Sequence, residues 1–572
     1  NESFNKAYLN SGSMITARNA SASLDRTLRH QLTSLLNYKK SFSGKHNVNA
    51  LLGAEYFTER AFSMSAGTRL SPTDLIYTMN MGSEANGVPD SFRTGYEIAS
   101  LFGQVNYDFD YKYLVGLTFR YDGTSRLGNN KYDFFPGISL GWNAHNEEFF
   151  KNSAISEYIT KLKPRISYGV NGNIDILSNF GVFGSYGATS VYYGQTGYVN
   201  NGLPMLDLKW ERSTTLNLGF DMGLLNNRVT IIADFFIRDV KDKLAALTLP
   251  LWTGFSSITT NNGTLQNRGL ELQVEADVLK TSSFTWNLGM TFYRVRNYAK
   301  QLPENGVEKN RQGGVEIYDP ATGKTIYVGG LQQGERVGYD VITAYIFDGV
   351  YKTQADIDAH AGRIVEFAQD KDTRFLGDAI WRDLNGDNII NYLDRAVIGR
   401  RTPKFSGGLT SGLTYKNLNL FVRTDFTVGH MIINGRRVKG IAQTQGNQNG
   451  PIEIRDTWTP QNPDSNIPIF TLVDRQKNHL AGGGDQGSMT SSSSRMWEKG
   501  DFLALREVTL SYTLPGAKVS SLFKDIRVYF TAANLAYFNG FSGSLPEESG
   551  DGIDYGRFPL PRTYTMGLSL TF

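Results

Sequence analysis

Apolar and polar residues alternate along most of this chain with a period of two. At the carboxy end every second residue is apolar: Tyr564, Met566, Leu568, Leu570 and Phe572. A period of two places side chains on opposite faces of a β-strand, so this segment is predicted to be a strand with one apolar face. Most alternating segments are about ten residues long, the length that a tilted strand needs to cross a bilayer.

The clearest segments come in pairs that are joined by short turns. Residues 101–109 and 113–121 flank a turn at 110–112, and residues 216–224 and 229–237 flank a second turn. Two alternating segments with a short turn between them predict a β-hairpin. Further strands are predicted at 29–42, 46–61, 136–142, 162–172, 270–278, 284–292, 405–415, 418–428, 502–514, 526–535 and 564–572. The total is about fifteen antiparallel strands.

One segment shows why the polar face of the strands must contact water. Between residues 270 and 278, Glu271, Gln273, Glu275 and Asp277 all project from the side opposite the apolar residues. A row of carboxylates cannot face lipid, so it is predicted to line the polar lumen of an all-β transmembrane barrel. The alternative is a soluble β-sandwich with its apolar side chains inside. The length of the strands and the aromatic residues near their ends favour the barrel.

Short and long connections alternate along the chain. The connections at 43–45, 416–417 and 515–524 are short, whereas long ones fall at about 67–95, 174–209, 245–263, 297–403, 431–500 and 537–561. In outer-membrane barrels the short turns are periplasmic and the long loops are extracellular. An odd-numbered sheet would leave unpaired edges in hydrocarbon. We therefore expect residues 1–572 to be the carboxy-terminal portion of one larger barrel.

Composition excludes several classes of protein. The chain is 40% hydrophobic, yet no apolar run approaches the roughly 18 residues of a membrane helix. The net charge is only +3 and Lys and Arg are scattered, so nucleic acid is not a predicted partner. Cys is absent, which excludes disulfides and thiolate metal sites in this sequence. The sequence opens without an apolar export signal, so we expect one to be cleaved or to lie upstream.

Six segments of the sequence resemble one family. They lie at 106–150, 162–173, 208–236, 261–274, 501–515 and 527–538, and they include the strings NYDFDYKYLVGLTFRYDG, LKPRISYGVNGN and DFLALREVTLSYTLP. In this order they resemble the SusC/RagA family of TonB-dependent outer-membrane transporters of Bacteroidetes. The resemblance covers nearly the whole chain, which makes it more specific than any single motif.

The resemblance implies a barrel of about 22 strands that is closed by an amino-terminal plug. About seven strands and the plug would then be absent from this chain, and coupling to the TonB complex would run through the missing amino-terminal part. The resemblance also implies a location in outer-membrane lipid, a SusD-like lipoprotein lid, and active import of a large nutrient, either an oligosaccharide or a peptide. A passive porin and a structural or adhesin barrel are the alternatives. The substrate itself is left open.

One loop segment carries oxygen ligands at a spacing typical of a calcium site. The predicted ligands are Asp383, Asn385, Asp387, the carbonyl of Ile389, and Asp394, at positions one, three, five, seven and twelve. Hard oxygen ligands at this spacing suit Ca²⁺. Two positions depart from the usual pattern, because Asn388 replaces Gly and Asp394 replaces Glu. We predict a structural Ca²⁺ that braces an extracellular loop. The alternative is an Asx-rich turn that satisfies its own backbone amides.

Catalytic motifs are absent from the sequence. The six His residues form no HExxH pair, no Ser stands in a nucleophile elbow, and no glycine loop carries a phosphate-binding Lys. The chain is therefore predicted not to be an enzyme. Ligand contacts are expected from aromatic residues in the long loops, because a sugar ring stacks on an aromatic face. The candidates are Tyr192, Tyr193, Trp252, Phe255, Tyr537 and Phe541.

Overall fold

The computed structural model describes residues 2–10, 13–15, 18–367, 371–442, 452–469, 493–515, 523–547 and 552–572. The chain divides into two compact units. Unit 1 comprises residues 1–143, 165–216 and 238–264, and unit 2 comprises residues 144–164, 217–237 and 265–572. Four strands contribute residues to both units: β10 (Ile159–Asn173), β13 (Glu211–Leu224), β14 (Val229–Thr248) and β15 (Ser257–Lys280).

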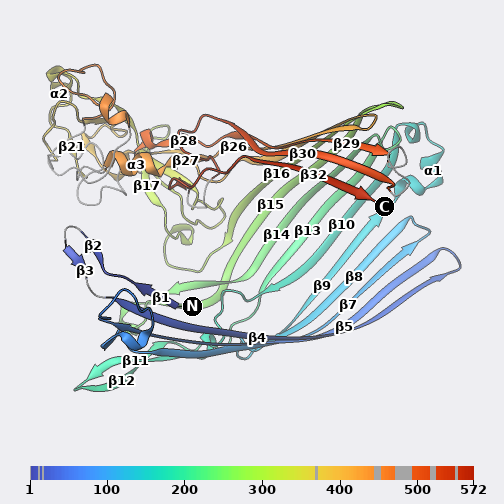
Figure 1. Cartoon of the computed structure of the whole chain (residues 1–572), viewed down its shortest axis with the longest axis horizontal. Helices are drawn as coiled ribbons and strands as arrows, with labels where there is room; N and C mark the ends of the chain where they lie inside the picture. Colours follow the sequence, from blue (N-terminus) through green and yellow to red (C-terminus); the bar gives the residue numbers. More distant parts are fainter. Residues whose placement is uncertain are drawn as a thin grey trace. The chain divides into compact units, whose positions relative to one another are not determined.

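Unit 1 is built on an antiparallel meander. Its strands pair in the order β1 (Glu2–Asn5), β4 (Asn19–Phe42), β5 (His46–Arg69), β7 (Asp90–Phe109), β8 (Tyr113–Thr124), β9 (Tyr132–Trp142) and β10. Strands β4, β5, β7, β8 and β9 run side by side in Figure 1. The turn between β4 and β5 places Ser43 and Gly44 at φ values of 50° and 66°. Two successive residues with positive φ suit a tight hairpin.

Unit 1 also contains short strands and an apolar core. The short strands are β2 (Tyr8–Asn10) with β3 (Ser13–Ile15), β6 (Glu84–Ala85) on β5, and the hairpin of β11 (Ser185–Tyr192) and β12 (Gln195–Gly202). The core gathers Leu127, Phe135, Val170, Ile174, Leu177, Val182, Leu208, Trp210 and Leu244. The indole of Trp210 donates a hydrogen bond to the carbonyl of Lys131 at 3.0 Å, so the largest core side chain is also satisfied.

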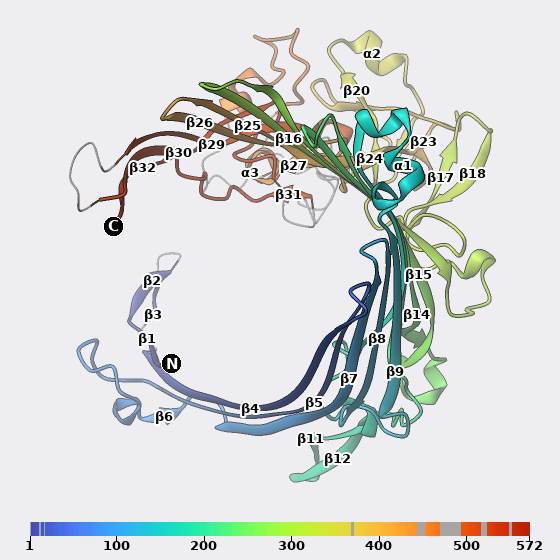
Figure 2. The ribbon, with the colours of Figure 1, turned by 90° about the vertical axis from the view of Figure 1, so that its right-hand side faces the viewer.

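Unit 2 contains a second antiparallel meander. Its strands pair in the order β16 (Phe284–Gln301), β25 (Phe405–Tyr415), β26 (Leu418–Val428), β29 (Phe502–Pro515), β30 (Asp525–Asn539) and β32 (Thr563–Thr571). Figure 2 shows β25, β26, β29, β30 and β32 side by side. Short turns join β15 to β16 and β25 to β26, whereas long connections join β16 to β25 and β26 to β29.

The long connections of unit 2 fold into small elements of their own. The first holds β17 (Val315–Asp319) with β18 (Lys324–Val328), β19 (Val341–Tyr345) with β24 (Arg395–Arg400), β20 (Phe347–Val350) with β22 (Ala379–Trp381), β21 (Ile364–Val365) with β23 (Ile389–Ile390), and α2 (Gln354–Asp358). The later ones hold β27 (Met431–Asn434), α3 (Gly435–Ala442), β28 (Trp497–Lys499) and β31 (Ile553–Asp554). Helix α1 (Glu148–Lys151) belongs to the same unit.

The fold is all-β, and the predicted turns at 43–45, 110–112 and 416–417 are confirmed. The strands, however, are longer than the alternating segments. Strands β4, β5 and β15 each span 24 residues. The loops predicted at 67–95 and 297–403 are therefore too long, since β7 begins at Asp90 and β16 ends at Gln301. Backbone pairing satisfies N–H and C=O groups whatever the side chains are, so strands continue past the apolar stretch.

The exposure of side chains in unit 2 is inverted relative to a water-soluble protein. In β29 the apolar Leu510 is 45% exposed, whereas the neighbouring polar Ser511 is only 3% exposed. Large apolar side chains on one continuous face are unfavourable in water and suit lipid. The described residues contain no helix of the length and apolarity that would cross a bilayer. Closure of the strands into a ring and the absence of a plug are not shown by these residues and stay predictions.

Candidate functional site

The strands of unit 2 have an outer face, which carries the exposed apolar residues, and an inner face opposite to it. Ser406, Thr427 and Phe502 stand opposite one another across β25, β26 and β29. The adjacent row contains Phe426 and the exposed Leu503. Residues that pair directly share one face, and neighbours along a strand alternate. The row of Ser406, Thr427 and Phe502 therefore belongs to the inner face.

A pocket of about 480 Å³ lies at this inner row. It is lined by Thr291, Ser406, Asp425, Thr427, His430, Phe502, Arg506, Pro546 and Glu547, and also by Gly407 and Phe426 of the adjacent row. The volume falls within the range of small-molecule sites. The lining combines a buried aromatic side chain with hydroxyls and charged groups, which is the mixture that orients a polar ligand.

Arg506 is the centre of the charged part of this pocket. Its Nε donates to Asp425 Oδ2 at 2.7 Å, its Nη1 donates to the hydroxyl of Tyr537 at 2.5 Å, and its Nη2 pairs with Glu547. The hydroxyl of Tyr537 in turn donates to Glu547 at 2.9 Å. One guanidinium is thus shared by two carboxylates. The group is internally paired and carries a net charge of about −1, so it does not favour an anionic ligand.

A β-bulge positions Arg506. Between β26 and β29 the register steps from Arg423 opposite Glu507 to Thr424 opposite Leu505, so that Arg506 is one extra residue in β29. On the other side Leu505 pairs with Ala536 and Glu507 with Ala533, so Arg506 stands unpaired opposite two residues of β30. Bulges redirect side chains and occur often beside functional sites. The sequence carries a signal for this bulge, because Arg506 and Glu507 are adjacent charged residues in an otherwise alternating strand.

His430 lines the same pocket and is 2% exposed. Its Nε2 lies 3.2 Å from the carbonyl of Pro546. A carbonyl only accepts, so we assign the proton to Nε2, which leaves Nδ1 as an acceptor. Nδ1 has no partner within the part of the chain that the structure describes. A buried acceptor without a partner is costly, and it favours completion of the site by a ligand or an ordered water.

The aromatic candidates in unit 2 have different surroundings. Tyr537 belongs to the Arg506 network at the pocket. Phe541 is buried in the loop after β30.

Sequence reasoning missed Arg506 and His430. The bulge could have pointed to Arg506, whereas nothing in the alternation marks His430, because it lies after the end of β26.

The aromatic candidates in unit 1 differ in exposure. Tyr193 and Trp252 are exposed, and Phe255 is half-buried. The side chain of Tyr192 lies outside the described residues. The role of these four residues in ligand contact stays a prediction.

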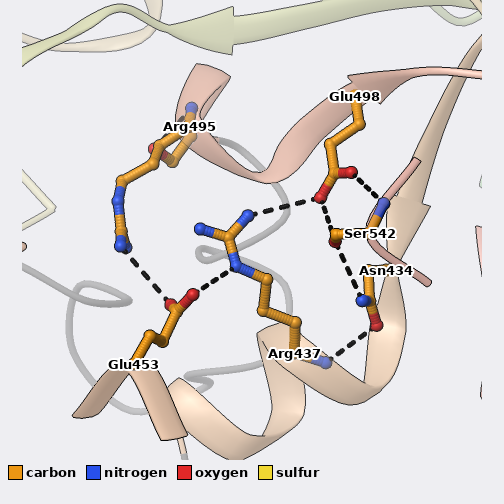
Figure 3. Close-up of polar contacts among 7 residues, drawn as sticks. Asn434, Arg437, Glu453, Arg495, Glu498 and Ser542 are labelled. Carbon is orange, nitrogen blue, oxygen red and sulfur yellow. Dashed lines mark hydrogen bonds and ion pairs between the residues drawn. The ribbon is translucent and has the colours of Figure 1, made fainter. Parts of the chain in front are cut away.

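A second polar cluster braces the loops of unit 2 (Figure 3). Arg437 on α3 donates to Glu453 at 2.8 Å and to Glu498 at 3.3 Å. Arg495 also donates to Glu453, at 3.4 Å, and burial lowers the pKa of its guanidinium. Glu498 accepts two hydrogen bonds from Ser542, each at 2.7 Å. Two cations and two carboxylates thus connect four loop segments, and the cluster is neutral.

The predicted calcium loop lies between β22 and β24. Asp383 accepts two backbone N–H groups at 2.7 and 2.8 Å, and Asp387 accepts a third from Ile389 at 2.7 Å. Asp394 is fully buried and accepts two more, at 2.8 and 2.9 Å; burial raises the pKa of this carboxyl. Within the described ranges, no three carboxylates or imidazoles are grouped as metal ligands. This bonding fits the Asx-turn alternative, and Ca²⁺ stays a prediction.

Comparison with known sequences identifies the family. The family model described as "TonB dependent receptor-like, beta-barrel" matches residues 1–474. TonB-dependent receptor P3 of Formosa agariphila is 30% identical over 562 residues, covering 94% of this chain and 52% of that protein. TonB-dependent receptor SusC of Bacteroides thetaiotaomicron is 28% identical over 505 residues, covering 84% of this chain and 44% of SusC. The chain spans about half the length of the curated relatives that it matches.

Comparison with solved structures agrees with the sequence comparison on the fold. The RagAB peptide transporter matches with a TM-score of 0.75 at 22% identity, covering 97% of this chain and 57% of that chain. The RagAB peptide importer in the open-open state matches with a TM-score of 0.77 at 22% identity, covering 98% and 56%. At this identity the likeness shows the fold alone. The predicted resemblance to SusC and RagA is confirmed. The chain belongs to the family of TonB-dependent receptor β-barrels.

Proposed function

We propose that this chain is the carboxy-terminal part of an active importer in the bacterial outer membrane. The observation that carries the proposal is the family-model match over residues 1–474, joined by the alignment to SusC. Because the chain spans about half of these relatives, a plug and a TonB-binding segment would come from sequence outside it. The family consists of transporters and receptors, so no catalytic role is proposed.

The proposed cargo is a glycan oligomer or a peptide, and the inner pocket of unit 2 would contact it. Phe502 supplies an apolar wall, Thr427 supplies a hydroxyl, and Nδ1 of His430 supplies an acceptor. These groups suit a neutral ligand that carries O–H or N–H donors, which both cargo classes do. The charged groups around Arg506 are already paired, so they would orient such a ligand through their remaining lone pairs.

A SusD-like lipoprotein is the proposed partner, and the folded loops of unit 2 would be its docking surface. The cluster of Arg437, Glu453, Arg495 and Glu498 supports this, since it cross-links the loops into one rigid group. A rigid surface loses less conformational entropy on binding than mobile loops do. The long connections would then form the upper rim on which the lid closes.

The test uses the full-length protein in its native host. The complex is extracted in mild detergent, its bound ligand is identified by mass spectrometry, and uptake of that ligand is measured with and without TonB. We expect uptake to stop without TonB and a SusD-like chain to co-purify. Uptake that continues without TonB, together with steady conductance in planar bilayers, would instead indicate a passive porin. A barrel that carries neither ligand nor current would indicate a structural or adhesin role.

A further inference from the structure

A second pocket of unit 2 has five cations among its fifteen lining residues. It has a volume of about 470 Å³ and lies between the loop end of β16, residues 336–340 and residues 401–406. Its charged lining residues are Arg294, Arg296, Arg336, Arg401, Lys404 and a single acid, Asp340. The carboxylate of Asp340 is already engaged by Arg400 at 2.6 Å and by the hydroxyl of Thr402. One carboxylate cannot balance this many guanidinium groups.

Several of these cations have no counter-ion among the described residues. The side chains of Arg294, Arg296 and Lys404 form no hydrogen bond or ion pair with the residues that the structure describes. Arg336 lies 3.7 Å from Asp340, which is a long contact for an ion pair. Burial lowers the pKa of the Arg336 guanidinium, and the nearby charge of Arg400 lowers it further. Positive charge is therefore in excess, and an anion would neutralise it.

The strand register places the unpaired arginines on the outer face. Phe292 and Phe426 belong to the outer row, and the ring of Phe405 lies 5.5 Å from the first and 6.4 Å from the second. Strand β16 continues beyond Phe292 to residue 301. Residues two apart in a strand share a face, so Arg294 and Arg296 follow Phe292 on the outer side.

The arginines also lie at a definite height above the apolar surface. Two residues advance about 7 Å along a strand, so Arg294 is one step beyond the aromatic group and Arg296 is two steps beyond it. Aromatic side chains mark the interface belts of membrane barrels. Arg336 joins the two arginines because it forms a bridge with Tyr298, the next outer-face residue of β16. Cations just beyond an aromatic belt lie at the depth of lipid headgroups.

We propose that Arg294, Arg296 and Arg336 bind the phosphate of a lipid headgroup in the outer leaflet. The proposal rests on the proposed function, because it requires the barrel to sit in the outer membrane. Guanidinium groups bind phosphate oxygens in pairs of parallel hydrogen bonds. A free phosphate ion has the same chemistry. The outer aromatic group favours the lipid, since acyl chains attached to the bound headgroup would lie against Phe292 and Phe426.

The test measures lipid binding to the full-length protein in detergent by native mass spectrometry. The probes are monophosphoryl lipid A, the same lipid without its phosphate, and inorganic phosphate. We expect the phosphorylated lipid to bind at least about tenfold more tightly than the dephosphorylated one. The variant Arg296→Gln is expected to lose about fivefold in affinity for the phosphorylated lipid, the usual contribution of one arginine at a membrane surface.

The matched control is Arg455→Gln, at an exposed arginine in the 3₁₀ turn Ile452–Asp456 that does not line the pocket. It should leave lipid affinity unchanged. Equal binding of the two lipids, or equal losses in the two variants, would overturn the proposal. If inorganic phosphate competes at concentrations similar to those of the lipid, the ligand of this site is a free phosphate ion and not a lipid headgroup. Thermal unfolding without lipid verifies the fold of each variant, and Arg294→Gln provides a second test. Loss of TonB-dependent uptake would not affect these results, so the two proposals can fail separately.

Discussion

The two pockets of unit 2 have nearly the same volume, about 480 and 470 Å³, but opposite charge balances. In the inner pocket, one cation, Arg506, is shared between Asp425 and Glu547. In the second pocket, which Tyr293 and Ser406 of the inner row also line, one carboxylate, Asp340, stands among several guanidinium groups. The difference shows that the volume of a pocket says little about the charge of the ligand that it suits. Which charges are already paired within the protein decides whether a pocket suits a neutral molecule or an anion.

The largest expected effect tests the definition of the faces, on which this comparison depends. Leu272→Arg would place a charge on the outer face of β15, where it should cost about 2 to 4 kcal/mol near the bilayer midplane. Gln273→Arg, one residue further on the inner face, should be tolerated. Folding of the full-length protein into lipid vesicles, followed by urea titration, measures both. Equal destabilisation by the two variants would mean that the faces are assigned incorrectly.

The next effect concerns the paired charges of the inner pocket. Arg506→Met should destabilise the protein by about 2 to 3 kcal/mol, because Asp425 and Glu547 would lose their shared cation. The cost is expected to fall below that of a fully buried pair, since Asp425 remains partly exposed. The double variant Arg506→Met with Glu547→Gln should recover part of the loss. A single variant as stable as the wild type in the same titration would show that the network contributes no stability.

A smaller effect extends the charge comparison to the loop at residues 383–394. If Ca²⁺ balances its three aspartates, calcium at ten times its dissociation constant should stabilise the protein by about 1.4 kcal/mol. Chelation should then lower the midpoint of thermal unfolding. Asp387→Asn should abolish the response, whereas Asp372→Asn, an aspartate outside the loop, should keep it. A midpoint that does not respond to calcium would favour the Asx-turn alternative.

The smallest effect is expected in the second pocket, which contains Arg294, Arg296 and Arg336. Arg336→Gln removes a cation that lies among other cations, so the free energy of unfolding should change by less than about 0.5 kcal/mol. This contrasts with Arg506→Met, although both changes remove an arginine from a pocket of similar size. Thermal unfolding in detergent, with no lipid added, measures the two side by side. A loss above 2 kcal/mol for Arg336→Gln would show that Asp340 depends on it more than their 3.7 Å separation indicates.

The alternation of apolar and polar residues predicted the strands and most short turns, because side-chain polarity in a barrel wall is set by lipid on one side and water on the other. The alternation underestimated the length of the strands. Beyond the bilayer the strands remain hydrogen-bonded to their neighbours, but water surrounds both faces and neither face has to be apolar. Strand β16 illustrates this: the alternation stops near Phe292, and the strand continues for nine residues to Gln301.

The site residues were predicted less well. Tyr537 was a candidate because it is an aromatic residue near a loop, but Arg506 and His430 were not. Their position depends on contacts between segments far apart in the chain, such as Arg506 with Asp425 and His430 with Pro546. A periodic pattern carries no information about such contacts. Arg506 lies in one of the six segments that resemble the SusC/RagA family. Only the strand register showed that it lies in a bulge.

Because Arg506 lies in a bulge, it is not part of the alternation of inner and outer side chains in β29. Without it, Phe502 to Leu505 and Glu507 to Leu514 would read as one uninterrupted alternation, so the strand would keep its pattern after a single-codon deletion. The loss of Arg506 would change the charge of the group around Asp425 and Glu547 from about −1 to about −2 and leave the same side chains of β29 on the outer face.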